Sequence, residues 1–207
     1  MSETNRVPQS NLVPEAKPVD IVAIQALIKE MTSDEDAMKR HKARLALVEI
    51  GSPAVPYLIE AMQNKRDWVR WEAANGLGAI ADAAAVPALV EALRDKVFDV
   101  RWLAAKGLIQ IGWRSTIPVI ESLIDHADSV WMRDGAHHVL HDLAKGRFQE
   151  PLEPILASLE GVEAAVEIPL TGRKVLEALK PIEVQAIREE HEAREKAEQE
   201  TESGAIE

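Results

Sequence analysis

Potential metal ligands are concentrated in one nine-residue segment of the 207-residue chain, DGAHHVLHD. On a helix, His137 and His141 would share one face at a spacing of four residues. Asp134, His138 and Asp142 would share another face by the same spacing. Imidazole and carboxylate groups can bind zinc or iron. Since one helix supplies too few ligands to close a metal site, the alternative is that these side chains pack and hydrogen-bond between helices.

Related segments elsewhere in the chain lack these ligands. The residues equivalent to the first and last of the three histidines are Ala74, Gly78, Ala105 and Ile109. A metal site would therefore be peculiar to one segment. We favour packing, keep His137 and His141 as the lesser metal candidates, and predict no cofactor.

Composition and charge exclude further classes of chemistry. The chain has no cysteine, which excludes disulfides, thiolate metal ligands and thiol nucleophiles. Its net charge of -11 would repel phosphate backbones, so we expect no nucleic-acid partner. The sequence has no apolar run as long as a membrane span, and residues 1–18 lack the apolar core of a secretory signal. We expect no membrane partner and a cytoplasmic location.

The elements that would position these residues repeat along the chain. Three segments align: WVRWEAANGLGAIA, DVRWLAAKGLIQIG and, more loosely, WMRDGAHHVLHDLA. Their arginines, Arg70, Arg101 and Arg133, are 31 and 32 residues apart. A second element, of the type AVPYLIEAM, repeats with the same period and carries a proline near its start. Proline is favoured in the first turn of a helix, so the repeating unit is predicted to be helix, turn, helix.

Hydrophobic spacing supports the same architecture. Val69, Ala73, Leu77 and Ile80 recur at helical spacing and form one apolar stripe. One helix pair cannot bury such a stripe alone, so neighbouring pairs must stack. An earlier copy is visible in RHKARLALVEIG, and residues 162–180 are typical of a degenerate last unit. We predict an all-α solenoid of about four or five helix pairs.

The pattern resembles HEAT repeats, in the short bacterial form also called the phycobilisome-lyase-type HEAT-like repeat. The matching motifs are the Val-Arg pair, the A-A-x-G-L that follows it, and the V-P-x-L of the other helix. The resemblance implies a right-handed α-α superhelix over residues 20–180. We expect residues 1–19 to be disordered and residues 181–207 to form an acidic tail, either helical or disordered.

The repeated arginines have two interpretations. The resemblance implies a ladder of Asp-Arg hydrogen bonds that links neighbouring units through Arg70, Arg101 and Arg133. Anion binding is the alternative, and we favour the structural ladder. The nearby acids in the sequence are Asp67, Asp99 and Asp128.

Trp71 and Trp102 directly follow equivalent arginines and lie off the apolar stripe. The resemblance implies that the second helix of each pair lines the concave face, where the two rings would anchor a partner. The alternative is that both rings fill gaps left by alanines and glycines. The remaining residues expected on the binding face are Asn75, Lys106, Asp134 and His138. The other tryptophans, expected to pack at turns or helix starts, are Trp68, Trp113 and Trp131.

A binding function and an enzymatic function therefore compete. An interaction surface needs exposed anchors on a rigid face, whereas an enzyme needs a convergent polar pocket. We predict a non-enzymatic module that binds a protein partner on its concave face, with monomer slightly favoured over dimer. The enzymatic alternatives are a bilin lyase-like protein, since the resembling repeats occur in such enzymes, and a metal-dependent HEAT-like enzyme.

Overall fold

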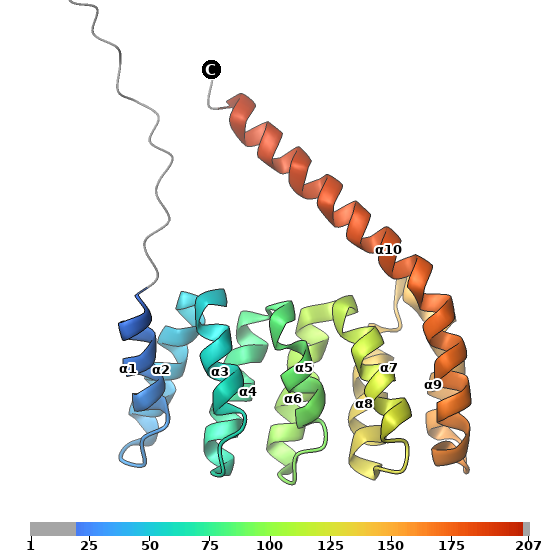
Figure 1. Cartoon of the computed structure of the whole chain (residues 1–207), viewed down its shortest axis with the longest axis horizontal. Helices are drawn as coiled ribbons and strands as arrows, with labels where there is room; N and C mark the ends of the chain where they lie inside the picture. The colour runs from blue at the N-terminus through green and yellow to red at the C-terminus, as the bar shows by residue number, and fades with distance from the viewer. Residues whose placement is uncertain (1–19, 205–207) are drawn as a thin grey trace, which may run out of the picture.

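A computed structural model describes residues 20–204, so the segment 1–19 that was expected to be disordered lies outside the described residues. Within residues 20–204 all regular elements are helical and there is no strand, which confirms the predicted all-α solenoid (Figure 1). The α-helices are α1 (Ile21–Met31), α2 (Ala37–Ile50), α3 (Val55–Ala61), α4 (Asp67–Ile80), α5 (Val86–Ala92), α6 (Phe98–Ile111), α7 (Thr116–Asp125), α8 (Val130–Leu143), α9 (Gln149–Glu160) and α10 (Ala164–Gly204). Short 3-10 turns separate the pairs: η1 (Ser52–Ala54), η2 (Ala83–Ala85), η3 (Gly112–Ser115) and η4 (Gly146–Phe148).

Local sequence determines where these helices begin and end. Proline occupies the first turn of α3 and of α5, as the repeat predicts. Helices α2 and α6 end at Gly51 and Gly112, whose φ angles of 76° and 84° favour glycine. At the equivalent position after α4 stands Ala81, with a φ of 55° in the left-handed region. All three positions have a positive φ, but the turns differ, because ψ is -140° at Gly51 and -147° at Gly112 and is 34° at Ala81.

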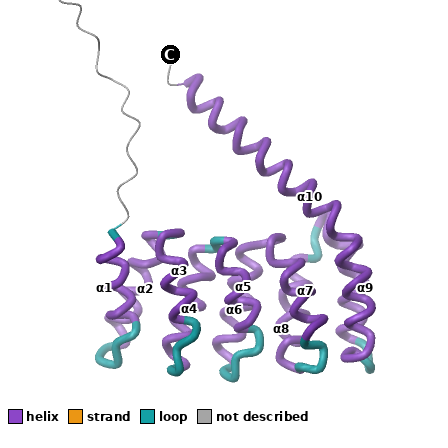
Figure 2. The backbone as a smooth tube through the Cα atoms, in the orientation of Figure 1, coloured by secondary structure: helices purple, strands orange, loops and turns teal. Residues whose placement is uncertain are grey.

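The helices form two layers. The first layer contains α1, α3, α5 and α7, and the second contains α2, α4, α6 and α8, with the loops inside each pair gathered along one edge (Figure 2). The fifth pair enters in reverse: α9 packs on α8 in the second layer, and α10 packs on α7 in the first. Helix α9 thus pairs with α10, its neighbour in sequence.

One apolar core runs through the whole stack. Val69, Ala73 and Leu77 of the predicted stripe are fully buried, and Ile80 packs at its edge. In the second layer, α4 and α6 meet through Gly78 and Gly107. A Cβ atom placed on Gly78 would lie 3.0 Å from the Cα of Gly107, so glycine is needed for this approach.

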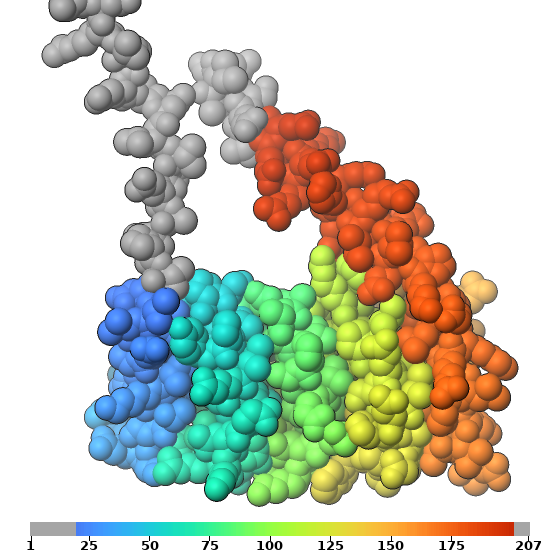
Figure 3. All heavy atoms as spheres, viewed as in Figure 1, coloured from blue at the N-terminus to red at the C-terminus, as the bar shows by residue number. Residues whose placement is uncertain are grey.

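Helix α10 packs against the stack and then leaves it (Figure 3). It runs without interruption to Gly204 and contains Pro181, which removes a backbone hydrogen bond of the kind that keeps a helix straight. Beyond this proline, Glu190 accepts a hydrogen bond of 2.9 Å from the Trp113 indole N–H. Glu189 pairs with Arg147 at 2.6 Å, which lowers the pKa of this carboxyl below its ordinary value. These contacts hold part of the acidic segment against η3 and η4.

Candidate functional site

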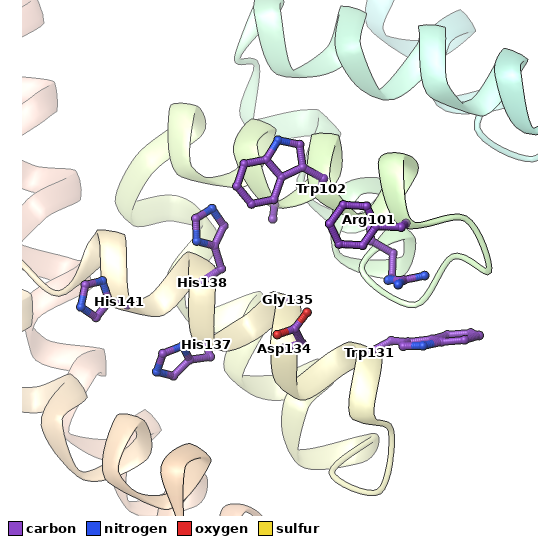
Figure 4. A pocket seen from close by; sticks show the side chains of 10 residues that line it. Arg101, Trp102, Trp131, Asp134, Gly135, His137, His138 and His141 are labelled. Atoms are coloured by element: carbon purple, nitrogen blue, oxygen red, sulfur yellow. The ribbon is translucent and has the colours of Figure 1, made fainter.

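A groove of about 390 Å³ lies between α6 and α8 (Figure 4). It combines aromatic rings, one arginine, one carboxylate and three imidazoles on two neighbouring second-layer helices. The lining residues are Phe98, Arg101, Trp102, Ala105, Trp131, Asp134, Gly135, His137, His138 and His141. The groove is open to solvent and its walls are rigid helices, so it is suited to binding.

The aromatic side chains of the groove are exposed. Trp102 of α6 stacks on His138 of α8, with ring centroids 4.8 Å apart and an angle of 20° between the rings. Trp102 is 50% exposed, Trp131 is 46% exposed and Phe98 is 58% exposed. Large apolar groups that remain in water on one surface are typical of interaction sites. The groove therefore presents exposed aromatic rings that a partner could cover, and it does not enclose a cavity.

Arg101 lies among these rings. Its guanidinium carbon is 4.8 Å from the centroid of the Trp131 ring and 5.6 Å from that of Phe98. Its Nη1 donates a hydrogen bond of 2.8 Å to the backbone carbonyl of Asp95. Contact with aromatic faces stabilises the cation without neutralising it.

The repeated arginines share one backbone contact. Arg70 donates to the carbonyl of Asn64 at 2.9 Å, and Arg133 donates to the carbonyl of Ala127 at 2.6 Å. Arg101 makes the equivalent bond, so each arginine fixes the loop that precedes its own helix. This common role accounts for the repeat of arginine with a period of 31 or 32 residues.

At Arg70 the predicted ladder contains an ion pair between neighbouring units. Its Nε and Nη2 donate to the two carboxylate oxygens of Asp95 in the next unit, at 2.6 and 2.9 Å. Burial alone would raise the pKa of Asp95, but hydrogen bonds from Arg70 and from the Val97 N–H hold this pKa below its ordinary value. The hydrogen bond from Arg70 to Asp95 in turn raises the pKa of Arg70. The acidic partner of Arg70 is thus Asp95 and not Asp67. Asp67 instead accepts a hydrogen bond from the Trp68 backbone N–H.

The two tryptophans at equivalent positions have different surroundings. Trp71 is half-buried and packs against the core, while Trp102 is exposed and stacks on His138. Of the other residues expected on this face, Asp134 and His138 line the groove with Trp102. Asn75 on α4 is half-buried and Lys106 on α6 is exposed, and neither is among the lining residues of the groove.

The three histidines line the groove without converging on one point. The rings of His137 and His141 are 6.0 Å apart and tilted, and His137 Nε2 lies 3.3 Å from a carboxylate oxygen of Glu160. Among the described side chains, those of residues 20–200, no group of three or more His, Asp or Glu is arranged to hold a metal ion. The same range contains no helix that is long and apolar enough to cross a membrane.

Two aromatic residues of the groove were not among the residues predicted for the binding face. Phe98 was not considered, and Trp131 was expected to pack at a helix start. Their spacing in the sequence could have identified them, because Phe98 precedes Trp102 by four residues and Trp131 precedes Asp134 by three. Each residue therefore shares a helix face with one that was assigned to the binding surface.

Comparisons with known proteins agree with the repeat pattern. The family model for HEAT repeats matches residues 24–101, and the model for the PBS lyase HEAT-like repeat matches residues 100–126. Among solved structures, a chain from the complex of CpcE and CpcF of phycocyanin lyase from Nostoc sp. PCC7120 is similar. It is 27% identical with a TM-score of 0.51, and the match covers 73% of this chain and 99% of that chain. A comparison with curated protein sequences gave no match.

Proposed function

We propose that this chain, whose repeats match the family model for HEAT repeats, binds a partner protein through the groove between α6 and α8. The observation that carries the proposal is the exposure of Phe98, Trp102 and Trp131 around that groove. Tryptophan is enriched among residues that dominate binding energy at interfaces, and a rigid helical face limits the entropy lost on binding. The similar chain belongs to a complex of two proteins, which supports this choice.

The polar groups of the groove support a second candidate function. The chain is similar to a component of phycocyanin lyase, and His137, His138 and His141 line the groove beside Arg101. Imidazoles transfer protons near neutral pH, and arginine pairs with carboxylates. A bilin lyase-like activity would use the thiol of an acceptor protein, so the lack of cysteine in this chain is compatible with it.

Affinity capture from a lysate of the native organism tests the first function. Wild type is compared with the Trp102→Ala, Trp131→Ala double variant and with Met38→Ala, which removes an exposed apolar side chain on α2. We expect the double variant to lose a partner that wild type and Met38→Ala both retain. Circular dichroism melts must show that all three proteins are folded. Retention of every partner by a folded double variant would overturn the proposal.

Titration with biliverdin tests the second function. A saturable change in the bilin absorption spectrum, lost in the double variant and kept in Met38→Ala, is expected if the groove holds a tetrapyrrole. A change of equal size in all three proteins would count against a lyase-like role, because it would show that binding does not depend on the groove.

A further inference from the structure

We infer that Arg101 is an open carboxylate-binding position, which the partner protein fills with an Asp or Glu side chain. The inference rests on the proposed function, since it names the chemistry that the partner presents to the groove. It follows from a comparison of two equivalent arginines within this one chain.

The comparison begins with Arg70, whose guanidinium is fully engaged. Its Nη1 donates to the carbonyl of Asn64, in the loop before α4. Its Nε and Nη2 donate to the two carboxylate oxygens of Asp95 in the next unit. Both side chains of the ion pair are about one-tenth exposed. This is the bidentate geometry in which arginine binds carboxylates best.

Arg101 occupies the same position one unit later, but it has no carboxylate partner of the kind that Asp95 provides for Arg70. The backbone carbonyl of Asp95 accepts a hydrogen bond from Arg101, and that of Ala127 accepts the equivalent bond from Arg133. Ala127 therefore corresponds to Asp95 in the following unit, and its methyl group cannot accept a hydrogen bond. Nη1 of Arg101 is bonded to the Asp95 carbonyl, while its Nε and Nη2 have no hydrogen-bond partner within residues 20–200. The two donors that hold a carboxylate on Arg70 are therefore available on Arg101.

The surroundings of Arg101 favour a carboxylate carried by a polypeptide. Asp134 also lines the groove, but neither it nor any other acid among residues 20–200 forms an ion pair with Arg101 within 4.0 Å, so the cation remains unneutralised there. Trp131 and Phe98 lie beside the guanidinium and leave about half of their surfaces in water. A free anion would leave these rings exposed, whereas the apolar neighbours of an acidic side chain would cover them.

The first test fills the position from within the chain. Ala127→Asp would supply the carboxylate that the fourth unit lacks, and Ala127→Asn is the matched uncharged control. We expect Ala127→Asp to raise the melting temperature relative to Ala127→Asn, and we expect the difference to disappear in an Arg101→Gln background. An equal difference in both backgrounds would show that Arg101 does not receive the carboxylate, and would overturn the inference without touching the proposed function.

The second test supplies the carboxylate from outside. The probes are the peptides acetyl-Leu-Glu-Leu-Leu-amide and acetyl-Leu-Gln-Leu-Leu-amide, and sodium acetate serves as the free carboxylate. Binding is followed by the shift of the Arg101 Nε–H signal in nitrogen-15 NMR spectra. We expect the Glu peptide to bind about tenfold more tightly than the Gln peptide and more tightly than acetate. Ala127→Asp should abolish this preference, while Ala127→Asn should keep it.

The outcomes separate the two proposals. Equal affinity for the Glu and Gln peptides would overturn the carboxylate inference, and so would acetate binding as tightly as the Glu peptide. The protein-binding function fails only if the folded Trp102→Ala, Trp131→Ala variant captures every partner. A partner that needs the tryptophans but is retained equally by Ala127→Asp would leave the function standing and reject the role of Arg101.

Discussion

Arg70 and Asp95 join the second and third helix pairs through two parallel hydrogen bonds, 2.6 Å from Nε to Oδ2 and 2.9 Å from Nη2 to Oδ1. Because both side chains are nearly buried, removal of one charge leaves the other without compensation. We expect Asp95→Asn to lower the free energy of unfolding by about 3 kcal/mol. Asp128→Asn, at an exposed loop acid, should change it by less than about 0.5 kcal/mol. Urea denaturation followed by circular dichroism measures both, and equal effects would contradict the expected role of the pair.

The same ion pair predicts how stability depends on pH. The pKa of Asp95 is lower in the folded chain than its ordinary value, despite the opposing effect of burial. A lowered folded pKa contributes stability that is present above the unfolded pKa of about 3.9 and is lost as the pH falls through the folded value. We therefore expect the gap in unfolding free energy between wild type and Asp95→Asn to be constant near neutrality and to narrow below about pH 4. Denaturation series from pH 7 to pH 3 measure the gap, and a gap that widens in acid would contradict the assignment.

Ala81 has a positive φ at a helix end where the equivalent residues of the neighbouring units are glycines. Its φ of 55° is in the left-handed region, where a side chain costs about 1 kcal/mol, while Gly51 and Gly112 adopt positive φ at equivalent positions. We expect Ala81→Gly to stabilise the chain by up to about 1 kcal/mol. Ala79→Gly, two residues earlier in α4, should instead destabilise it by about 0.5–1 kcal/mol. Thermal unfolding of the two variants provides the comparison, and destabilisation by both would show that the turn is not strained.

The repeat was predictable because its signals are local. Arginine at a fixed period, proline in a first turn and an apolar stripe each follow from interactions within one helix pair, and the structure contains all three. Trp71 and Trp102 could not be distinguished in this way, because they occupy equivalent positions and differ in what lies next to them. His138 of α8 stacks on Trp102, whereas Trp71 packs against the core. The reversed entry of α9 and α10 likewise depends on contacts between units, which no spacing within one unit reveals.

Because Trp71 packs against the core and Trp102 is exposed, truncation of each should affect stability and partner affinity differently. Trp71→Ala would remove a half-buried ring from the edge of the core, so we expect a loss of about 2 kcal/mol in unfolding free energy. Trp102→Ala would remove an exposed ring and its stacking on His138, which should cost about 1 kcal/mol of stability.

The affinity for the partner should fall more in Trp102→Ala than in Trp71→Ala, the reverse of the order expected for stability. A central tryptophan contributes at least about 2 kcal/mol to an interface, so Trp102→Ala should weaken capture of the partner by roughly thirtyfold or more. Trp71→Ala should leave affinity nearly unchanged at temperatures where the variant is fully folded, since its ring is turned to the core. Melting curves and binding isotherms measured on the same preparations decide the matter. If Trp71→Ala abolished binding while Trp102→Ala left it intact, the partner surface would lie over α4 rather than between α6 and α8.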